Sequence, residues 1–228
     1  MFRFGGASIA IIGLALVSNS ISPPLLPVTL GVSGASGLLY AVRTIKFLLR
    51  AEYTIELVAS KATYQVWQAE QNIRMPAEPS KQAQFWRQQA QEWGGQLTCH
   101  AATNVGAGIA SGSFRTLGMV VIPCSMSTVA KIANGLSSDL LERTADVHLK
   151  EQRPLVIVPR ETPFSLIHLR NLTTLAEAGA RIVPAIPAWY HHPQTIEDLA
   201  DFVVARALDQ LGIDCVPLQR WQGTETQI

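Results

Sequence analysis

Short apolar runs alternate with amphipathic stretches along most of this chain. We predict strands over residues 28–32, 54–59, 97–100, 119–123, 155–158 and 181–184, because each is a short and nearly continuous apolar run. Helical periodicity predicts helices over 37–50, 62–70, 80–93, 126–133, 139–150 and 163–178, and Thr195-x-x-Asp198 opens a last helix with a capping box. On that last helix we expect an apolar seam of Ile196, Leu199, Val203 and Ala207, with Arg206 at its margin.

The alternation of strands and helices predicts the fold. Nearly continuous apolar strands joined by helices are typical of an α/β protein with a doubly wound parallel sheet covered on both faces. In such sheets, ligands bind outside the carboxyl ends of the strands. We therefore expect one candidate site at the strand ends, formed by residues 33–37, 60, 125–128 and 160–161.

The loop after the first strand is rich in glycine, with Gly31, Gly34 and Gly37 beside Ser33 and Ser36. A strand, a glycine loop and a helix present free backbone N–H groups and a positive helix end to an anion. The G-x-x-G-x-x-G spacing is neither the dinucleotide fingerprint nor a P-loop. A tight strand-to-helix turn without a ligand has the same pattern, so the loop alone leaves both interpretations open.

A second corner of the same design follows the fourth strand, where Cys124-Ser-Met-Ser-Thr opens a helix. The second strand ends at Ser60 and not at an acidic residue, which makes NAD a poor fit. The fifth strand ends in Arg160-Glu161 before a proline-rich turn, and loops at such positions often carry chemistry.

Composition narrows the possible functions. The 228 residues are 48% hydrophobic, which suits one compact domain, and 18 basic against 17 acidic side chains give no electrostatic case for a nucleic-acid partner. Three widely spaced cysteines without a C-x-x-C motif predict buried thiols in a reducing compartment. The histidine spacings match no zinc motif, so we expect no metal site.

The first residues are ambiguous. An apolar run at 7–17 has signal-peptide length but is short for a membrane span. We favour an N-terminal extension over 1–29, a folded domain over 30–221 and a C-terminal tail over 222–228. This interpretation implies a cytoplasmic protein that is not inserted in a membrane.

Taken together, several blocks of the sequence resemble the flavin prenyltransferase family of the UbiX type. The matching blocks are G-V-S-G-A-S-G at 31–37, A-S-G-S-F-R at 110–115, P-C-S-M-S-T at 123–128, L-L-E-R-T-A-D-V-H-L-K-E at 140–151, R-P-L-V-I-V-P-R-E-T-P at 153–163 and P-A-W-Y-H-H-P-Q-T at 187–195. The resemblance covers residues 30 to about 221. It implies a flavodoxin-like, Rossmann-like three-layer sandwich that assembles as a homo-oligomer, usually a dodecamer, with active sites at subunit contacts.

The resemblance also implies a reaction. Such an enzyme joins the dimethylallyl group of dimethylallyl monophosphate to N5 and C6 of reduced FMN, without a metal, and the prenylated FMN serves a UbiD-type decarboxylase. The implied FMN contacts are Gly34, Ala35, Ser36, Ser60, Ser125, Met126, Ser127, Thr128 and Arg160. The implied phosphate ligands are Tyr190, Arg206, Arg143 and Lys150. Ser36, Glu161 and Lys150 are the implied catalytic residues, with Glu70 joining from a neighbouring subunit and Trp221 covering the site.

The chemistry agrees with these residue types. Without a metal, cations must neutralise the phosphate leaving group, and aromatic faces stabilise an allylic cation. The sequence departs from the family at Val105, where an aromatic residue is common, at Gly108, where a proline is common, and at Ser127. On its own, Arg143 is equally well interpreted as a solvated charge, and Glu70 as a surface carboxylate.

Two other functions remain open. An FMN-dependent decarboxylase of the phosphopantothenoylcysteine type shares both flavin corners, but that family has a catalytic histidine in the loop that spans 107–113 here, and this loop contains none. A non-enzymatic flavin-binding subunit would bind FMN without turnover.

Overall fold

The computed structural model of the chain describes residues 26–218, 221 and 223. Its strands are β1 (Val28–Val32), β2 (Thr54–Ala59), β3 (Gln96–His100), β4 (Gly118–Cys124), β5 (Leu155–Pro159) and β6 (Arg181–Ile182). Its helices are α1 (Leu39–Arg50), α2 (Lys61–Gln71), α3 (Pro79–Ala90), α4 (Met126–Ala133), α5 (Leu140–Lys150), α6 (Leu166–Glu177) and α7 (Ile196–Asp209), with a short 3₁₀ helix η1 (Gly108–Ala110).

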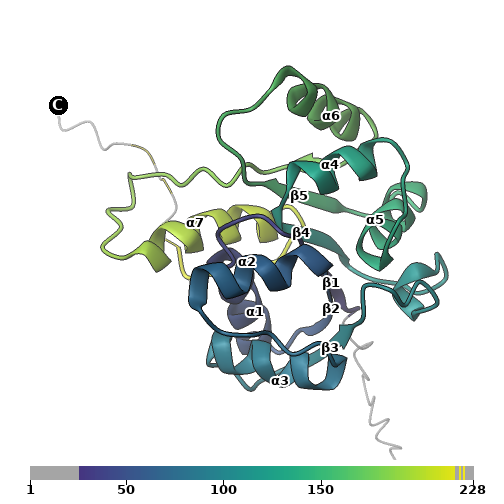
Figure 1. Cartoon of the computed structure of the whole chain (residues 1–228). Helices are drawn as coiled ribbons and strands as arrows, with labels where there is room; N and C mark the ends of the chain where they lie inside the picture. The colour runs from purple at the N-terminus through teal and green to yellow at the C-terminus, as the bar shows by residue number, and fades with distance from the viewer. Residues whose placement is uncertain (1–25, 219–220, 222, 224–228) are drawn as a thin grey trace, which may run out of the picture.

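The described strands form one parallel sheet in the order β3-β2-β1-β4-β5-β6 (Figure 1). This confirms the predicted doubly wound sheet, and the order is that of the Rossmann type. The chain builds outward from β1 to β3, then returns to β4 and builds the other way to β6. The strand order therefore reverses between β1 and β4, and the crevice at that point is where ligands bind in such sheets.

Alternating side chains of the strands point to the two faces of the sheet. Leu30, Leu57 and Val120 belong to a core that also includes α1, α2, α3 and α7. Val121 and Ile157 point the other way, into a second core with α4, α5 and α6. Both faces of the sheet are thus covered by helices. Because side chains on both faces are buried, the strands are nearly continuous apolar runs in the sequence.

The first strand has its predicted bounds, Val28–Val32, but other boundaries and faces differ from the sequence-based expectation. Of the expected N-terminal extension, residues 1–25 lie outside the described residues. Helix α6 begins at Leu166, not at 163, because the Ser165 hydroxyl accepts a hydrogen bond from the His168 backbone N–H at 3.2 Å and caps the helix there. Ile196 is 72% exposed and does not belong to the buried face of α7. The first buried residue of that helix is Ala200.

Helix α3 is also more deeply anchored than the expected surface helix. Its Phe85 and Trp86 are buried against Trp67 of α2, with ring centroids 5.1 and 5.2 Å from that indole. The sequence-based expectation missed this aromatic cluster because residues 71–95 are mostly polar. The cluster belongs to the core that joins α2 and α3 to the sheet. Within residues 26–218, no helix is both long and apolar enough to cross a bilayer.

Candidate functional site

Two of the predicted strand ends meet at the crevice between β1 and β4. The buried Ser33 hydroxyl donates to the Pro123 carbonyl at 3.1 Å and accepts from the Ser125 backbone N–H at 2.7 Å. Its hydrogen-bonding capacity is therefore used to join the two loops. Although Ser33 belongs to the expected site at 33–37, its hydroxyl is not free for a ligand; the side chain is a structural link between the corners.

The glycine loop has a structural reason as well as a functional one. A Cβ added to Gly34 would lie 2.3 Å from the Cβ of Ala62, so glycine is required for α2 to approach the loop. Gly37 has φ +94°, a conformation that side chains disfavour. Ala35 is buried, and Ser36 is exposed at the tip of the loop. Ser36 is thus the loop hydroxyl that can reach a ligand.

The N-terminus of α1 already has an anionic partner. The Glu70 carboxylate accepts hydrogen bonds from the backbone N–H groups of Gly37 at 2.8 Å and Leu38 at 3.2 Å. The positive helix end that the sequence suggested as a phosphate site is therefore neutralised by a carboxylate from α2. This contact is made within one chain, whereas the resemblance suggested that Glu70 joins from a neighbouring subunit.

The second corner is the start of α4. The Ser125 hydroxyl caps the helix by accepting from the Thr128 backbone N–H at 3.3 Å. Met126 and Thr128 are buried, Ser125 is half-buried and Ser127 is exposed. At the neighbouring tip, Ser60 is half-buried with its hydroxyl 3.1 Å from that of Thr63.

Arg160 lies directly after β5, beside these corners. Its backbone N–H donates to the Cys124 carbonyl at 3.1 Å, which holds the residue at the β4–β5 edge of the crevice. Its side-chain Nε is buried and has no hydrogen-bond partner among the described residues. Its charge acts on Tyr40 of α1, opposing the rise that burial causes in the pKa of that phenol.

A flavin fits this arrangement. A buried N–H of a guanidinium needs an acceptor, and a flavin offers carbonyl oxygens, ring nitrogens and a phosphate. The crevice at the strand reversal is the place where such a ligand is expected. The residues that would hold the flavin are those of the two corners together with Arg160.

A cavity of about 300 Å³ opens beside Arg160 and Glu161. It is lined by residues 159–164 and by Pro184, Ala185 and Ile186. Glu161 is half-buried there, and its Oε1 accepts from the Thr162 backbone N–H at 3.1 Å. A carboxylate that lines a cavity next to an unsatisfied guanidinium is well placed to transfer a proton.

A second cavity of about 340 Å³ lies between β6 and α7, and Pro184 and Ile186 line both cavities. Arg206 and Phe202 line the second one, and Arg206 pairs with Asp209 at 2.8 Å. The Phe202 ring also contacts Tyr190, with ring centroids 5.9 Å apart. The walls that the two cavities share thus connect Glu161 to Arg206, and Tyr190 adjoins the second cavity through its contact with Phe202.

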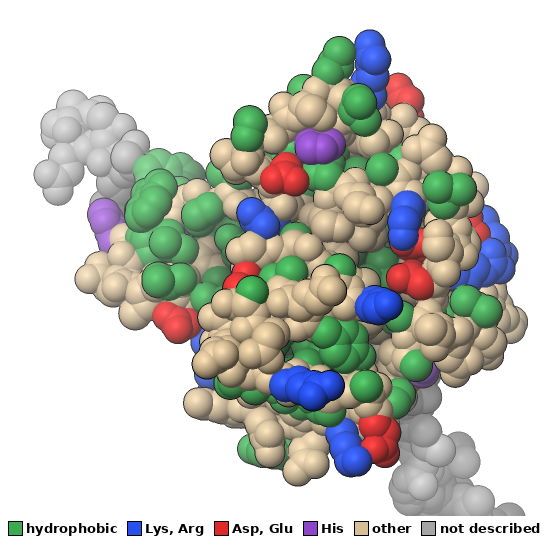
Figure 2. Space-filling view, viewed as in Figure 1, with side chains coloured by type: hydrophobic (Ala, Val, Ile, Leu, Met, Phe, Trp, Pro, Cys, Tyr) green, Lys and Arg blue, Asp and Glu red, His purple; other side chains and the backbone are tan. Residues whose placement is uncertain are grey.

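Trp189, Tyr190 and Trp221, which flank α7 in the sequence, are exposed aromatic side chains. Hydrophobic side chains also gather in a patch on the face that Figure 2 shows. Trp189 and Trp221 are 69% and 61% exposed, and the Trp221 ring lies 5.7 Å from that of Tyr190. Trp221 therefore contacts Tyr190, one of the residues that the resemblance implies for the donor phosphate, and its expected role as a cover of the site stays a prediction.

The structure does not bring Lys150 to the strand ends of its own chain. Lys150 ends α5 and pairs with Glu151 at 2.5 Å. Nearby Arg153 donates to the Gly112 and Phe114 carbonyls, in the loop that leads into the start of β4. The end of α5 therefore lies at the amino edge of the sheet, opposite the strand ends. Arg143 pairs with Asp146 at 2.7 Å on the same helix.

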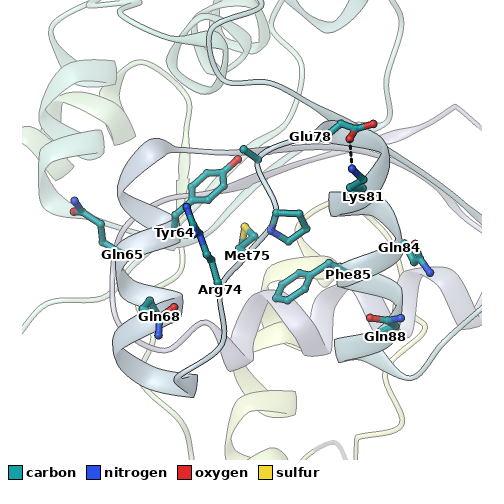
Figure 3. A pocket seen from close by; sticks show the side chains of 12 residues that line it. Tyr64, Gln65, Gln68, Arg74, Met75, Glu78, Lys81, Gln84, Phe85 and Gln88 are labelled. Atoms are coloured by element: carbon teal, nitrogen blue, oxygen red, sulfur yellow. Dashed lines mark ion pairs between the residues drawn. The ribbon is translucent and has the colours of Figure 1, made fainter.

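A larger cavity lies elsewhere. A groove of about 1140 Å³ separates α2 from α3, with Tyr64, Met75 and Phe85 at its base and polar side chains around them (Figure 3). None of the predicted site residues lines it. We place the candidate site at the strand ends instead, because the unsatisfied Arg160 side chain and the helix N-termini meet there.

Sequence reasoning missed three residues near the site. Tyr40 follows the glycine loop by one helical turn, so its proximity to Arg160 was available from the helical period. His191 and Phe202 stack with ring centroids 5.5 Å apart and an interplanar angle of 8°, a contact between a loop and a helix that no sequence pattern predicts.

Among the described residues, no three His, Cys, Asp or Glu side chains are grouped as a metal site would require.

Comparison with known proteins identifies the family. The family profile described as Flavoprotein matches residues 18–208. Flavin prenyltransferase UbiX of Synechocystis sp. is 77% identical over 198 residues, which are 86% of this chain and 96% of that protein. UbiX of Pseudomonas aeruginosa is 44% identical over 194 residues, 85% of this chain and 93% of that protein. The chain belongs to the flavin prenyltransferase family.

Solved structures of the family agree with this fold. AnUbiX (PadA1), described in complex with FMN and dimethylallyl pyrophosphate, matches with a TM-score of 0.77 and 39% identity over 88% of this chain and 100% of the other. A dodecameric FMN-dependent UbiX-like decarboxylase from Escherichia coli O157:H7 matches with a TM-score of 0.75 and 39% identity over 87% of this chain and 100% of the other. The resemblance inferred from the sequence blocks is confirmed.

Proposed function

We propose that this protein is a flavin prenyltransferase. It joins a dimethylallyl group from dimethylallyl monophosphate to N5 and C6 of reduced FMN, and the prenylated FMN serves a UbiD-type decarboxylase. The observation that carries the proposal is the buried, unpartnered Nε of Arg160 at the strand-order reversal, next to a cavity lined by Glu161. The 77% identity to a UbiX covered over 96% of its length supports the same activity.

The residues have distinct roles in this proposal. Ser36, Ser60, Ser125 and Ser127 present hydroxyl groups to the flavin, Arg160 supplies a charge-assisted hydrogen bond, and Gly34, Ala35, Met126 and Thr128 shape the corners. Reduced FMN, when bound, supplies the two nucleophilic atoms. Glu161 and Ser36 handle protons, since both reach the open side of the crevice.

Arg206 and Tyr190 bind the phosphate of the donor. The Arg206 guanidinium carries the positive charge that stabilises the leaving phosphate, and the Tyr190 hydroxyl adds a hydrogen bond. The aromatic surface around Tyr190 and Trp221 provides π faces for the developing allylic cation, each worth about 0.5–2 kcal/mol when desolvated.

Lys150 and Arg143 act in this proposal on the site of another copy of the chain. Lys150 lies at the amino edge of the sheet, away from the strand ends of its own chain, and a 39% identical structural relative is described as dodecameric. A homo-oligomer, in our proposal a dodecamer, would bring the amino edge of one sheet to the carboxyl edge of another. The enzyme works in the cytoplasm, a compartment that suits its three free cysteines.

One experiment tests the proposal against its alternatives. Purified protein is incubated anaerobically with reduced FMN and dimethylallyl monophosphate, and the released flavin is analysed by mass spectrometry. A gain of one prenyl unit is the expected result. Unmodified FMN despite tight binding would instead favour a flavin-storage subunit, and decarboxylation of a cysteine-type substrate would favour the decarboxylase.

A further inference from the structure

His191 is a half-buried residue with buried ring nitrogens, and the proposed reaction does not use it. Both of its ring nitrogens, Nδ1 and Nε2, are buried and have no hydrogen-bond partner among the described residues. A histidine normally satisfies at least one nitrogen when it is buried, because an unpaired buried polar atom is costly. Its aromatic face, by contrast, is fully engaged. The ring lies flat on Phe202, with centroids 5.5 Å apart and planes 8° apart.

Tyr190 is held at right angles to this stack. The Tyr190 ring meets His191 edge-to-face at 5.8 Å and Phe202 edge-to-face at 5.9 Å. Such T-shaped contacts between ring centroids at 4.5–7 Å are attractive and directional. The Tyr190 ring therefore has a defined orientation even though the residue is 40% exposed.

The stack is attached to a rigid part of the fold. Phe202 belongs to α7, which packs on α1, and the adjacent Asp201 forms a two-point ion pair with Arg43 of α1. Tyr190 and His191 are the central residues of a turn that the His192 N–H closes on the Trp189 carbonyl at 3.1 Å. The turn places both rings against Phe202, so α7 orients Tyr190 directly through Phe202 and also through the His191 ring.

We infer that His191 is a positioning residue for Tyr190: its ring is an aromatic plate that packs against both Phe202 and the Tyr190 ring. Neither ring nitrogen takes part, because both are buried and have no hydrogen-bond partner among the described residues. The inference rests on the proposed function, in which Tyr190 binds the donor phosphate. It predicts that an aromatic ring is required at position 191 and that an imidazole is not.

The test is a double-mutant cycle on the FMN-loaded, full-length protein. We expect His191→Ala to raise the KM for dimethylallyl monophosphate about tenfold, with kcat within about twofold and FMN affinity unchanged, because misplacement of a binding group weakens the oriented complex. His191→Phe should restore the wild-type KM. In a Tyr190→Ala background, His191→Ala should have no further effect, since residues that act through one another are not additive. His192→Asn, at the exposed neighbouring histidine, is the matched control.

Three results would overturn the inference. They are an unchanged KM in His191→Ala, a KM in His191→Phe as high as in His191→Ala, and additive effects of the His191 and Tyr190 substitutions. Donor affinity for the oxidised FMN-loaded protein, measured by calorimetry, separates this inference from the proposed reaction. If the wild type binds the donor but forms no prenylated flavin, the proposed function fails, and the affinities of the same variants still decide the role of His191.

Discussion

At the scale of single residues, the unpartnered Nε of Arg160 gives the sharpest expectation for cofactor binding. We expect Arg160→Met to raise the Kd for FMN by about 10- to 100-fold, because a hydrogen bond to a charged group contributes about 1.5–3 kcal/mol. Flavin fluorescence quenching measures this change. Arg50→Met, at a side chain that is 66% exposed, should leave the Kd unchanged. Equal affinities of Arg160→Met and wild type would remove Arg160 from the flavin site.

Glu161 gives a second prediction at this scale. Glu161→Gln should lower kcat by about 10²- to 10⁴-fold, the usual contribution of a general acid or base, with the Kd for FMN unchanged. Single-turnover formation of prenylated flavin measures the loss. Glu177→Gln on the exposed end of α6 is the control. Wild-type turnover in Glu161→Gln would exclude the carboxyl group from proton transfer.

Residue types were easier to predict from the sequence than residue orientations. The hydroxyl and glycine pattern of the first loop correctly indicated a corner at the sheet edge. It did not reveal that Ser33 faces inward to Pro123, or that Gly34 is needed to admit Ala62. Those facts depend on contacts between segments about 30 to 90 residues apart, which local spacing does not encode. The same holds for Glu70, whose partner is the start of α1.

At the scale of elements, His148 connects α5 to the segment before β4. Its Nδ1 donates to the Thr144 carbonyl at 2.8 Å, and its Nε2 lies 2.8 Å from the Thr116 hydroxyl, so both nitrogens of the neutral ring are satisfied. Burial lowers the pKa of His148 to about 4, from an ordinary value of 6.5. As the pH falls, the His148 side chain therefore binds a proton near pH 6.5 in the unfolded chain, but only near pH 4 in the folded chain.

This difference predicts a loss of stability in mild acid. The contribution of His148 is fully present above pH 6.5 and is lost as the pH falls toward 4, by about 3 kcal/mol in total. We expect urea unfolding to show the loss in the wild type and a smaller one in His148→Gln, which keeps hydrogen-bonding groups but does not titrate. His192→Asn, at an exposed histidine, should follow the wild type. Parallel pH curves for wild type and His148→Gln would contradict the assignment.

Most elements were predictable because each carries its own periodicity. The strand β2 and the helix α4 have the predicted bounds, and the capping box at Thr195 and Asp198 is present. The start of α6 was missed because Ser165 competes with Pro163 as the first helical signal, and the hydrogen bond with His168 decides between them. The burial of α3 was missed because Trp67 and Trp86 meet across two helices.

At the scale of the whole molecule, the alternation of elements was enough to predict the parallel sheet and the edge that carries the site. It could not place Lys150 and Arg143 relative to that edge. The sequence blocks that contain them resemble the family as strongly as the strand ends do, but α5 ends at the amino edge of the sheet. A site that one chain leaves incomplete is a property of an assembly, which the sequence of one chain does not describe.

Mixed oligomers test whether Lys150 serves a neighbouring copy. Lys150→Ala and Glu161→Gln are each expected to be nearly inactive alone. If the two residues meet across a subunit contact, random mixing at equal amounts gives wild-type pairs at about a quarter of the sites, because each half of a site is drawn independently. Activity should therefore return on co-refolding or co-expression. If both residues acted within one chain, every site would lack one of them and mixing would restore nothing. Mixing Glu161→Gln with itself under the same conditions controls for gains due to refolding alone.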